Sequence, residues 1–283
     1  MAAQLDILND PLLRRVIGAL SEVPGVEATV LGGSRARGAA HESSDYDIGL
    51  YFAAARPLDT KGLLEVARQL VDEPDETKVT PVGEWGPWIV GGGWLTIQGQ
   101  KVDLLYRELD AVREVIDACR EGRITMHYQP GHPHGFCSAI WMGEIAYCQA
   151  LHDPRQAIAE LKSIALTYPV ALREALIRKF QWEILFSIEN AEIAALREEK
   201  THVAGCVYRA LACIAQVLFA LNEQYLINEK GALQEAAELP LTIPRLMEKV
   251  ASLWRHLGIG AYESTLATLR GIERDLKVRT RHG

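Results

Sequence analysis

The residues with the most chemical information are a glycine–serine turn, Gly32-Gly33-Ser34, and two aspartates, Asp45 and Asp47, which follow it after a spacer of ten residues. Side chains alternate between the two faces of a strand, so aspartates at i and i+2 project from the same face. Two carboxylates at such a short distance repel each other, and the repulsion raises the pKa of one of them unless a cation lies between them. A divalent metal that also holds a triphosphate removes this conflict, and the glycine turn offers a place for phosphate. The combination points to nucleotidyl transfer, although either piece alone is also common in solvated turns and strands.

Apolar residues surround both pieces. Val30-Leu31 precede the turn, and Ile48 and residues 50–52 follow the acids. This order predicts a strand, a phosphate-binding turn with a short helix, a loop, and a second strand that carries the acids. The Gly-Lys-Ser/Thr ending of a P-loop is missing.

The stretch from Leu31 to Tyr51 resembles the signature of the DNA polymerase β-like nucleotidyltransferase superfamily: an apolar residue, Gly, Gly or Ser, about ten residues, then Asp-apolar-Asp-apolar. Within it, Gly-Ser-Arg-Ala-Arg-Gly followed by Ser-Asp-Tyr-Asp-Ile-Gly-Leu is similar to the small bacterial enzymes that adenylylate aminoglycosides and lincosamides and so confer antibiotic resistance. The resemblance implies an enzyme that uses Mg²⁺ and transfers AMP from ATP, or the equivalent from another NTP, to a hydroxyl of a small molecule. Related domains act on tRNA ends or on proteins in toxin–antitoxin and regulatory systems, and this alternative stays open.

The resemblance also implies roles for the residues of the signature. Asp45 and Asp47 hold the metal, and Gly33 and Ser34 seat the terminal phosphates of the nucleotide. Arg35 and Arg37 are i and i+2 on a short helix and cannot both face the phosphates,. We assign Arg37 to the nucleotide, and a surface position remains the alternative for each arginine.

Composition limits the class of protein. At 283 residues the chain can form two domains,. The net charge of −7 disfavours a broad grip on nucleic acid, which needs a basic surface,. Residues 1–6 lack the basic and apolar regions of a signal peptide, and the odd number of cysteines, five, suits a reducing cytoplasm,. No apolar run approaches the length of a membrane span, since the longest, residues 210–220, contains Gln216,.

The sequence predicts an α+β fold: a mixed-sheet nucleotidyltransferase domain over residues 1–125, then an all-α domain over residues 126–283. The first domain is expected to contain helices near residues 12–20 and 60–71, a strand over residues 26–31, and short strands at 78–82 and 88–90. Residues 94–97 and 101–106 read as a hairpin. Asp103 lies in its returning strand between apolar residues, where an ionised carboxylate is costly unless it is paired or near a metal. By resemblance Asp103 is the third acid, which holds a second metal or accepts the proton of the attacking hydroxyl; an edge-strand aspartate facing water is the alternative.

The second domain reads as long helices over residues 136–151, 154–166, 169–200 and 202–225, with three shorter helices after them. Glu144 interrupts an apolar helix, and Glu223 and Lys230 flank a helix end. Glu144 and Glu223 are candidates to bind the acceptor, and Lys230 is a candidate to bind the nucleotide phosphates. Charged residues at such positions are also often only solvated.

Tryptophans form a further pattern in the first domain. Trp85, Trp88 and Trp94 are close in sequence, and they fit either core packing beneath the sheet, which we favour, or stacking on a ligand ring. Residues 91–93 are three glycines, and without the spacing of a dinucleotide fingerprint they predict a bulge or a turn.

Overall fold

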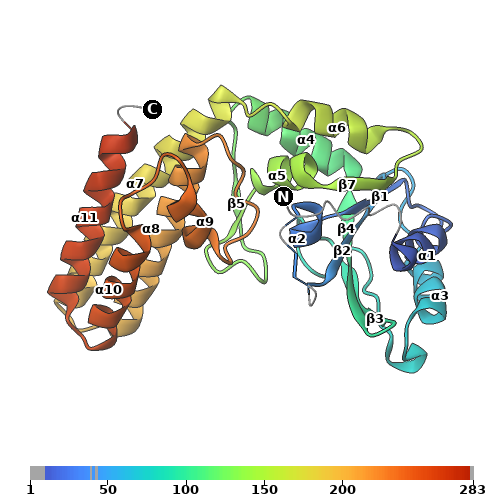
Figure 1. Cartoon of the computed structure of the whole chain (residues 1–283), viewed down its shortest axis with the longest axis horizontal. Helices are drawn as coiled ribbons and strands as arrows, with labels where there is room; N and C mark the ends of the chain where they lie inside the picture. Colours follow the sequence, from blue (N-terminus) through green and yellow to red (C-terminus); the bar gives the residue numbers. More distant parts are fainter. Residues whose placement is uncertain (1–9, 39, 42–43, 281–283) are drawn as a thin grey trace. The chain divides into compact units, whose positions relative to one another are not determined.

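The computed structural model describes residues 10–38, 40–41 and 44–280 (Figure 1), so residues 1–6, compared above with a signal peptide, lie outside it. The chain divides into two compact units. The first comprises Met1–Asp117, His127–Gly131 and Trp141–Thr167, and the second comprises Ala118–Met126, His132–Ile140 and Tyr168–Gly283. The division predicted after residue 125 differs from this one, because the segment 141–167 returns to the first unit and adds a strand to its sheet.

The first unit is a sheet with helices. Its elements are α1 (Pro11–Leu20), β1 (Ala28–Leu31), α2 (Gly33–Ala36), β2 (Tyr46–Phe52), α3 (Thr60–Leu70), the 3-10 turn η2 (Pro74–Glu76), β3 (Gly92–Ile97), β4 (Gln100–Glu108), α4 (Leu109–Arg120), α5 (Ile140–Tyr147), β7 (Gln149–His152) and α6 (Ala157–Ala165). The short strands β5 (Met126–His127) and β6 (Phe136–Cys137) pair separately.

The five strands of the main sheet have the order β3-β4-β2-β1-β7. β2 and β4 are parallel, and the other neighbours are antiparallel. The sheet is therefore mixed, and the fold class predicted from the sequence is confirmed.

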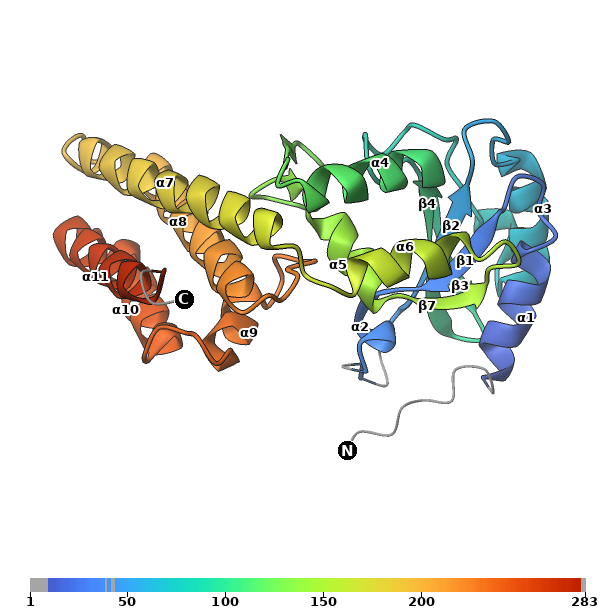
Figure 2. The ribbon, with the colours of Figure 1, turned by 90° about the horizontal axis from the view of Figure 1, so that it is seen from above.

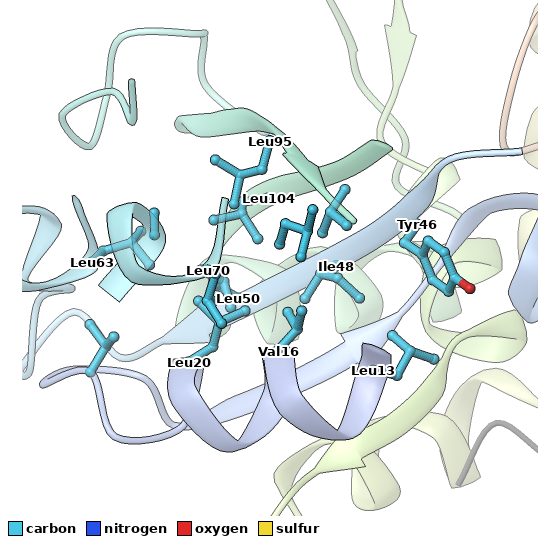
Figure 3. Packing of buried hydrophobic residues seen from close by; sticks show 14 of the residues in the cluster. Leu13, Val16, Leu20, Tyr46, Ile48, Leu50, Leu63, Leu70, Leu95 and Leu104 are labelled. Atoms are coloured by element: carbon cyan, nitrogen blue, oxygen red, sulfur yellow. The ribbon is translucent and has the colours of Figure 1, made fainter. Parts of the chain in front are cut away.

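One face of this sheet packs into the hydrophobic core of the unit. Tyr46, Ile48, Leu50 and Phe52 of β2 alternate with residues of the other face, and all four are buried. Figure 3 shows how side chains of α1 and α3 pack against this face. Labelled members of the cluster are Leu13, Val16, Leu20, Leu63, Leu70, Leu95 and Leu104. Because strand side chains alternate, the residues between the core positions, including Asp47 and Asp103, point to the opposite face.

The starts of helices α1 and α3 are capped by aspartate side chains. The side chain of Asp10 accepts hydrogen bonds from the backbone N–H of Leu12 and Leu13 at the start of α1, and Asp59 does the same for α3. Such caps satisfy N–H groups that have no partner within the helix. They explain why these two helices begin where the sequence predicts.

Several predicted elements differ in the structure. The helix expected over residues 136–151 is the short α5 followed by β7, because the edge of β1 offers a partner for antiparallel pairing. Residues 88–90 form no strand, and residues 78–82 contribute only the bridge between Val79 and Gly93. The glycine run is not a turn, since Gly92 and Gly93 lie in β3.

The second unit is helical. It contains α7 (Val170–Ala195), α8 (Lys200–Leu221), α9 (Ala232–Glu238), α10 (Leu246–Gly258) and α11 (Tyr262–Thr280). α7 runs beside α8, and α10 runs beside α11 (Figure 2). By length and composition α8 is able to cross a membrane, which corrects the prediction that no apolar run is long enough. Its apolar window is 67% buried inside the unit, as in the central helix of a helical domain,.

Candidate active site

Three aspartates meet on the face of the sheet opposite the hydrophobic core. β2 and β4 are paired so that Asp47 lies directly beside Asp103, and Asp45 precedes β2 by one residue. All three side chains are half-buried. Burial, together with the negative charges of Asp47 and Asp45, raises the pKa of Asp103 to about 6, although the charge of Lys101 lowers it. This is the electrostatic signature of carboxylates placed to share a cation.

The glycine turn lies against the second of these acids. Gly33 begins α2 with φ +61, a conformation that favours glycine, and an added Cβ would lie 1.8 Å from Oδ2 of Asp47,. The N–H of Gly32 donates to the carbonyl oxygen of Asp47 at 2.8 Å. The residue after Gly33, Ser34, is half-buried on α2. Gly33 and Asp47 are therefore so close that a residue with a side chain would not fit at position 33.

The two arginines of the turn lie in different surroundings. The guanidinium of Arg35 donates to the carbonyl oxygens of Ser44 and Asp45 and stacks on the ring of Tyr46 at 3.8 Å. Arg35 thus holds the backbone that carries the first acid. The guanidinium of Arg37 lies 5.6 Å from the ring centre of Tyr147. Its contact with the nucleotide stays a prediction.

Glu144 joins the acids from α5. Its Oε2 lies 3.8 Å from the position of a Cβ at Gly32 and 3.8 Å from Nη2 of Arg107. Burial raises the pKa of Glu144, the charge of Arg107 lowers it, and the charge of Asp47 raises it. The structure places Glu144 beside the turn, and its predicted contact with the acceptor stays a prediction.

Arg107 is a residue of this face that the sequence interpretation missed. It lies on β4 four residues after Asp103, is 4% exposed, and stacks over Trp141 at 4.8 Å. The alternation of Asp103, Leu105 and Arg107 on one strand was the available signal, because all three positions share a face. The buried cation offsets part of the negative charge that Glu144 and Asp47 bring to this face.

The tryptophans do not form a core cluster. Trp94 on β3 is 69% exposed, and its ring stacks on that of Trp85 with centroids 4.6 Å apart. Trp88 instead makes an edge contact with His127. The favoured prediction of core packing is therefore wrong for Trp94.

Two predicted site residues belong to the helical unit. Glu223 forms an ion pair with Arg173 at 3.4 Å. Lys230 is exposed, and its backbone N–H donates to Asn228. Their contacts with acceptor and nucleotide stay predictions.

The helical unit holds a second cluster of side chains that can ligate metals. His134, Glu183 and Cys213 offer ligand atoms within 4.8 Å of one another. Glu183, however, already binds Lys179 at 3.0 Å and Arg209 at 2.7 Å. The two cations neutralise its charge without an ion, so this cluster is accounted for as a buried ion-pair network.

One of three comparisons with known proteins supports an assignment for part of the first unit. Residues 13–86 match the model of a nucleotidyltransferase domain. No curated protein sequence matches the chain. Among solved structures, a nucleotidyltransferase-like protein from Exiguobacterium sibiricum is similar, with 11% identity, coverage of 94% of this chain and 74% of that chain, and a TM-score of 0.43.

The matched region contains the glycine turn, Asp45 and Asp47 but ends before Asp103 and Glu144. Residues 13–86 therefore have the features of a nucleotidyltransferase domain, which supports an enzyme with nucleotidyltransferase activity in general. Domains of this family generally use a divalent metal and a nucleoside triphosphate. The three carboxylates fit such an ion, because oxygen ligands of like charge at close range are what a divalent cation stabilises.

Proposed function

We propose that the protein transfers a nucleoside monophosphate, AMP from ATP, to a hydroxyl group of a small molecule such as an aminoglycoside or a lincosamide and releases pyrophosphate. The pairing of Asp47 with Asp103 on adjacent strands, with Gly33 against Asp47, carries the proposal. This arrangement brings three carboxylates and a glycine turn together from three separate segments of the chain.

Each part of the site has a role in this reaction. Asp45 and Asp47 would hold Mg²⁺, which when bound would stabilise the negative charge that develops on the transferred phosphate, and Asp103 would hold a second metal or accept the proton of the attacking hydroxyl. Gly33 allows the terminal phosphates to approach the backbone, and the hydroxyl of Ser34 donates to them at the start of α2. Arg35 keeps Asp45 in place through its bonds to the preceding backbone.

The chemical step is an in-line displacement. The acceptor oxygen attacks the α-phosphorus, the bond from that phosphorus to the β-phosphate bridging oxygen breaks, and pyrophosphate leaves with the bonding electrons. The hydroxyl proton passes to a carboxylate on the side of attack, and Asp103 is the acid of the trio farthest from the glycine turn in strand order,.

Charge supports a small acceptor over a nucleic acid. The chain has a net charge of −7. A polyanion bound without base-specific contacts needs a basic surface that releases counterions. A small hydroxylated molecule has no such requirement.

The test is a transfer assay with separate acceptor classes. Purified protein with Mg²⁺ is incubated with each of the four NTPs and with panels of aminoglycosides and lincosamides, of tRNA, or of proteins, and products are identified by mass. The proposal expects the mass of one nucleoside monophosphate to be added to a small molecule and the addition to be lost in Asp47→Asn. A product found only in the tRNA or protein panel would replace the acceptor class, and no product in any panel would overturn the proposal.

A further inference from the structure

The stacked pair Trp85–Trp94 lies on the same face of the sheet as the aspartates. Trp94 of β3 is paired directly with Asp103 of β4. In an antiparallel pair, directly opposed residues share a face and their Cβ atoms lie about 5 Å apart. The exposed Trp94 ring is therefore the immediate neighbour of the third acid.

Trp85 reaches this face because β3 has a glycine where a side chain would block it. A Cβ at Gly92 would lie 2.6 Å and 2.7 Å from two ring atoms of Trp85. Gly92 and Trp94 are two residues apart on one strand, so they point to the same face. The ring of Trp85 thus covers Gly92 and stacks on one face of the Trp94 ring.

The segment that carries Trp85 is anchored. The buried side chain of Gln129 donates to the carbonyl oxygen of Trp85 at 2.7 Å, and a Cβ at Gly86 would lie 2.4 Å from that same side chain. The stack is therefore held by packing and hydrogen bonding, while the Trp94 ring remains exposed. An exposed but fixed aromatic face next to catalytic acids is a typical ligand contact.

Strand order decides which part of the reaction this face serves. Across the sheet, the glycine turn follows β1, Asp47 lies on β2, Asp103 on β4 and Trp94 on β3. In an in-line displacement the attacking oxygen lies opposite the leaving group. With the pyrophosphate at the glycine turn, the acceptor approaches from the side of Asp103. Its body then lies over Trp94, roughly 10 Å from Asp47 at two strand spacings.

We infer that the Trp85–Trp94 stack binds the acceptor, and that it selects an acceptor whose hydroxyl is attached to or near a flat ring, either an aromatic ring or the apolar face of a sugar ring. This inference rests on the proposed function. A linear polyol offers no face to stack and is a poor acceptor.

Three variants of the exposed positions on β3 test this. Trp94→Ala removes the ring, Trp94→Phe keeps a flat face, and Thr96→Ala changes the next exposed residue of the same face, which pairs with Lys101. Because Trp94 is 69% exposed, its replacement leaves the core intact. Circular dichroism and thermal unfolding verify that all three fold as the wild type does.

The first measurement is binding, which needs no turnover. With Mg²⁺ and a non-hydrolysable ATP analogue occupying the nucleotide site, adenosine, methyl glucoside and sorbitol are titrated as probes of an aromatic ring, a sugar ring and an open chain. At least one ring compound binds the wild type, Trp94→Phe and Thr96→Ala, and binds Trp94→Ala about tenfold or more weakly, as expected for loss of ring stacking. Sorbitol binds all four proteins equally poorly. Equal affinity of the ring compounds for wild type and Trp94→Ala, or no ring binding by the wild type, overturns the inference.

The second measurement asks whether the nucleotide base uses the stack instead. The ATP analogue with Mg²⁺ is titrated alone into wild type and Trp94→Ala, and its affinity should change by less than about twofold because no ring contact is lost. A loss of about tenfold for the analogue would assign the stack to the base and overturn the acceptor role.

The third measurement separates this inference from the proposed function. In the transfer assay, the KM of Trp94→Ala for whichever panel compound the wild type modifies should rise about tenfold. Transfer by the wild type with an unchanged KM in Trp94→Ala rejects the stack and keeps the function. Absence of transfer by the wild type rejects the function, and the binding titration then still decides whether the stack holds a ring.

Discussion

The two units shift the pKa of a buried or half-buried carboxyl group in opposite directions. In the helical unit, the buried Glu183 is paired with Lys179 and Arg209, and their hydrogen bonds and charges lower its pKa although burial raises it. In the sheet unit, burial and the charges of Asp47 and Asp45 raise the pKa of Asp103 to about 6, although Lys101 lowers it. One carboxylate is stabilised in its charged form by the fold itself, and the other is not.

The difference separates structural charge from functional charge. A carboxylate that is already neutralised has little affinity left for an added cation, whereas a group of like charges at close range gains most from one. The sheet unit therefore keeps an unfavourable arrangement that a divalent ion relieves. The predictions below test that contrast.

Loss of a metal ligand should have the largest effect. Asp47→Asn or Asp45→Asn should reduce transfer at least a hundredfold, about 2.7 kcal/mol in the barrier, because each removes a carboxylate from the trio. The fold should remain, since the change also removes like-charge repulsion. Turnover at saturating Mg²⁺ is the measurement, with exposed Asp75→Asn as the control. More than a tenth of wild-type turnover would contradict the metal assignment.

A second prediction concerns the glycine turn and uses a matched pair. Gly33 and Gly38 both have positive φ, +61 and +69, but only at Gly33 would a Cβ meet Asp47. Gly33→Ala should therefore lose at least about tenfold in transfer, whereas Gly38→Ala should cost only the backbone strain of alanine at positive φ, roughly 1 kcal/mol of stability. Equal losses of activity in the two variants would show that backbone strain, not the contact with Asp47, explains the effect.

Asp103→Asn should separate chemistry from nucleotide binding. If Asp103 acts on the attacking hydroxyl, kcat falls about tenfold or more, while the affinity for Mg²⁺ and nucleotide stays near wild type. Calorimetry with Mg²⁺ and a nucleotide analogue, beside single-turnover rates, measures both. A normal kcat would make Asp103 an ordinary strand carboxylate.

In the helical unit, Glu183→Gln should change stability and not chemistry. The side chain is 5% exposed and holds two cations. Its neutralisation should cost about 1–3 kcal/mol of unfolding free energy, less than for a fully buried pair because both cations are partly exposed. Denaturant unfolding measures this, with exposed Glu174→Gln on the same helix as the control. A larger effect on kcat than on stability would argue against a structural role.

The smallest effect expected concerns the pH dependence of stability, which should have opposite signs for Asp103 and for Glu183. Asp103 has a folded pKa of about 6, above its ordinary value of 3.8, so its contribution to stability is full below pH 3.8 and is lost as pH rises through 6,. The pKa of Glu183 is lowered, so its contribution is present above its ordinary value of 4.5 and is lost as pH falls through the folded pKa,.

Thermal unfolding with and without Mg²⁺ tests this response. Without Mg²⁺, the Tm of the wild type should fall by a few degrees relative to that of Asp103→Asn as pH rises through 6, because Asp103 then ionises beside Asp47,. Glu183→Gln should leave this difference unchanged. A difference in Tm that does not vary with pH would contradict the raised pKa of Asp103.

Much of the sheet unit was predictable from local patterns. The order of apolar residues, glycine turn and two aspartates predicted the strand that carries the acids and the short helix before it, and both are present as β2 and α2. The segment 140–152 was not predictable, because an apolar run of that length is compatible with either helix or strand. Pairing with the free edge of β1 decided it.

The sequence by itself determined that Asp45 and Asp47 share a face, that glycine precedes them, and that a helical region follows, because these depend on backbone periodicity and on residue type. Only the tertiary structure decided that Asp103 lies beside Asp47, that Glu144 approaches Gly32, and that Trp94 stands exposed next to Asp103. Those juxtapositions depend on strand register and strand order. They are set by long-range packing between distant segments, and the local sequence of one segment does not specify which other segment it will pair with.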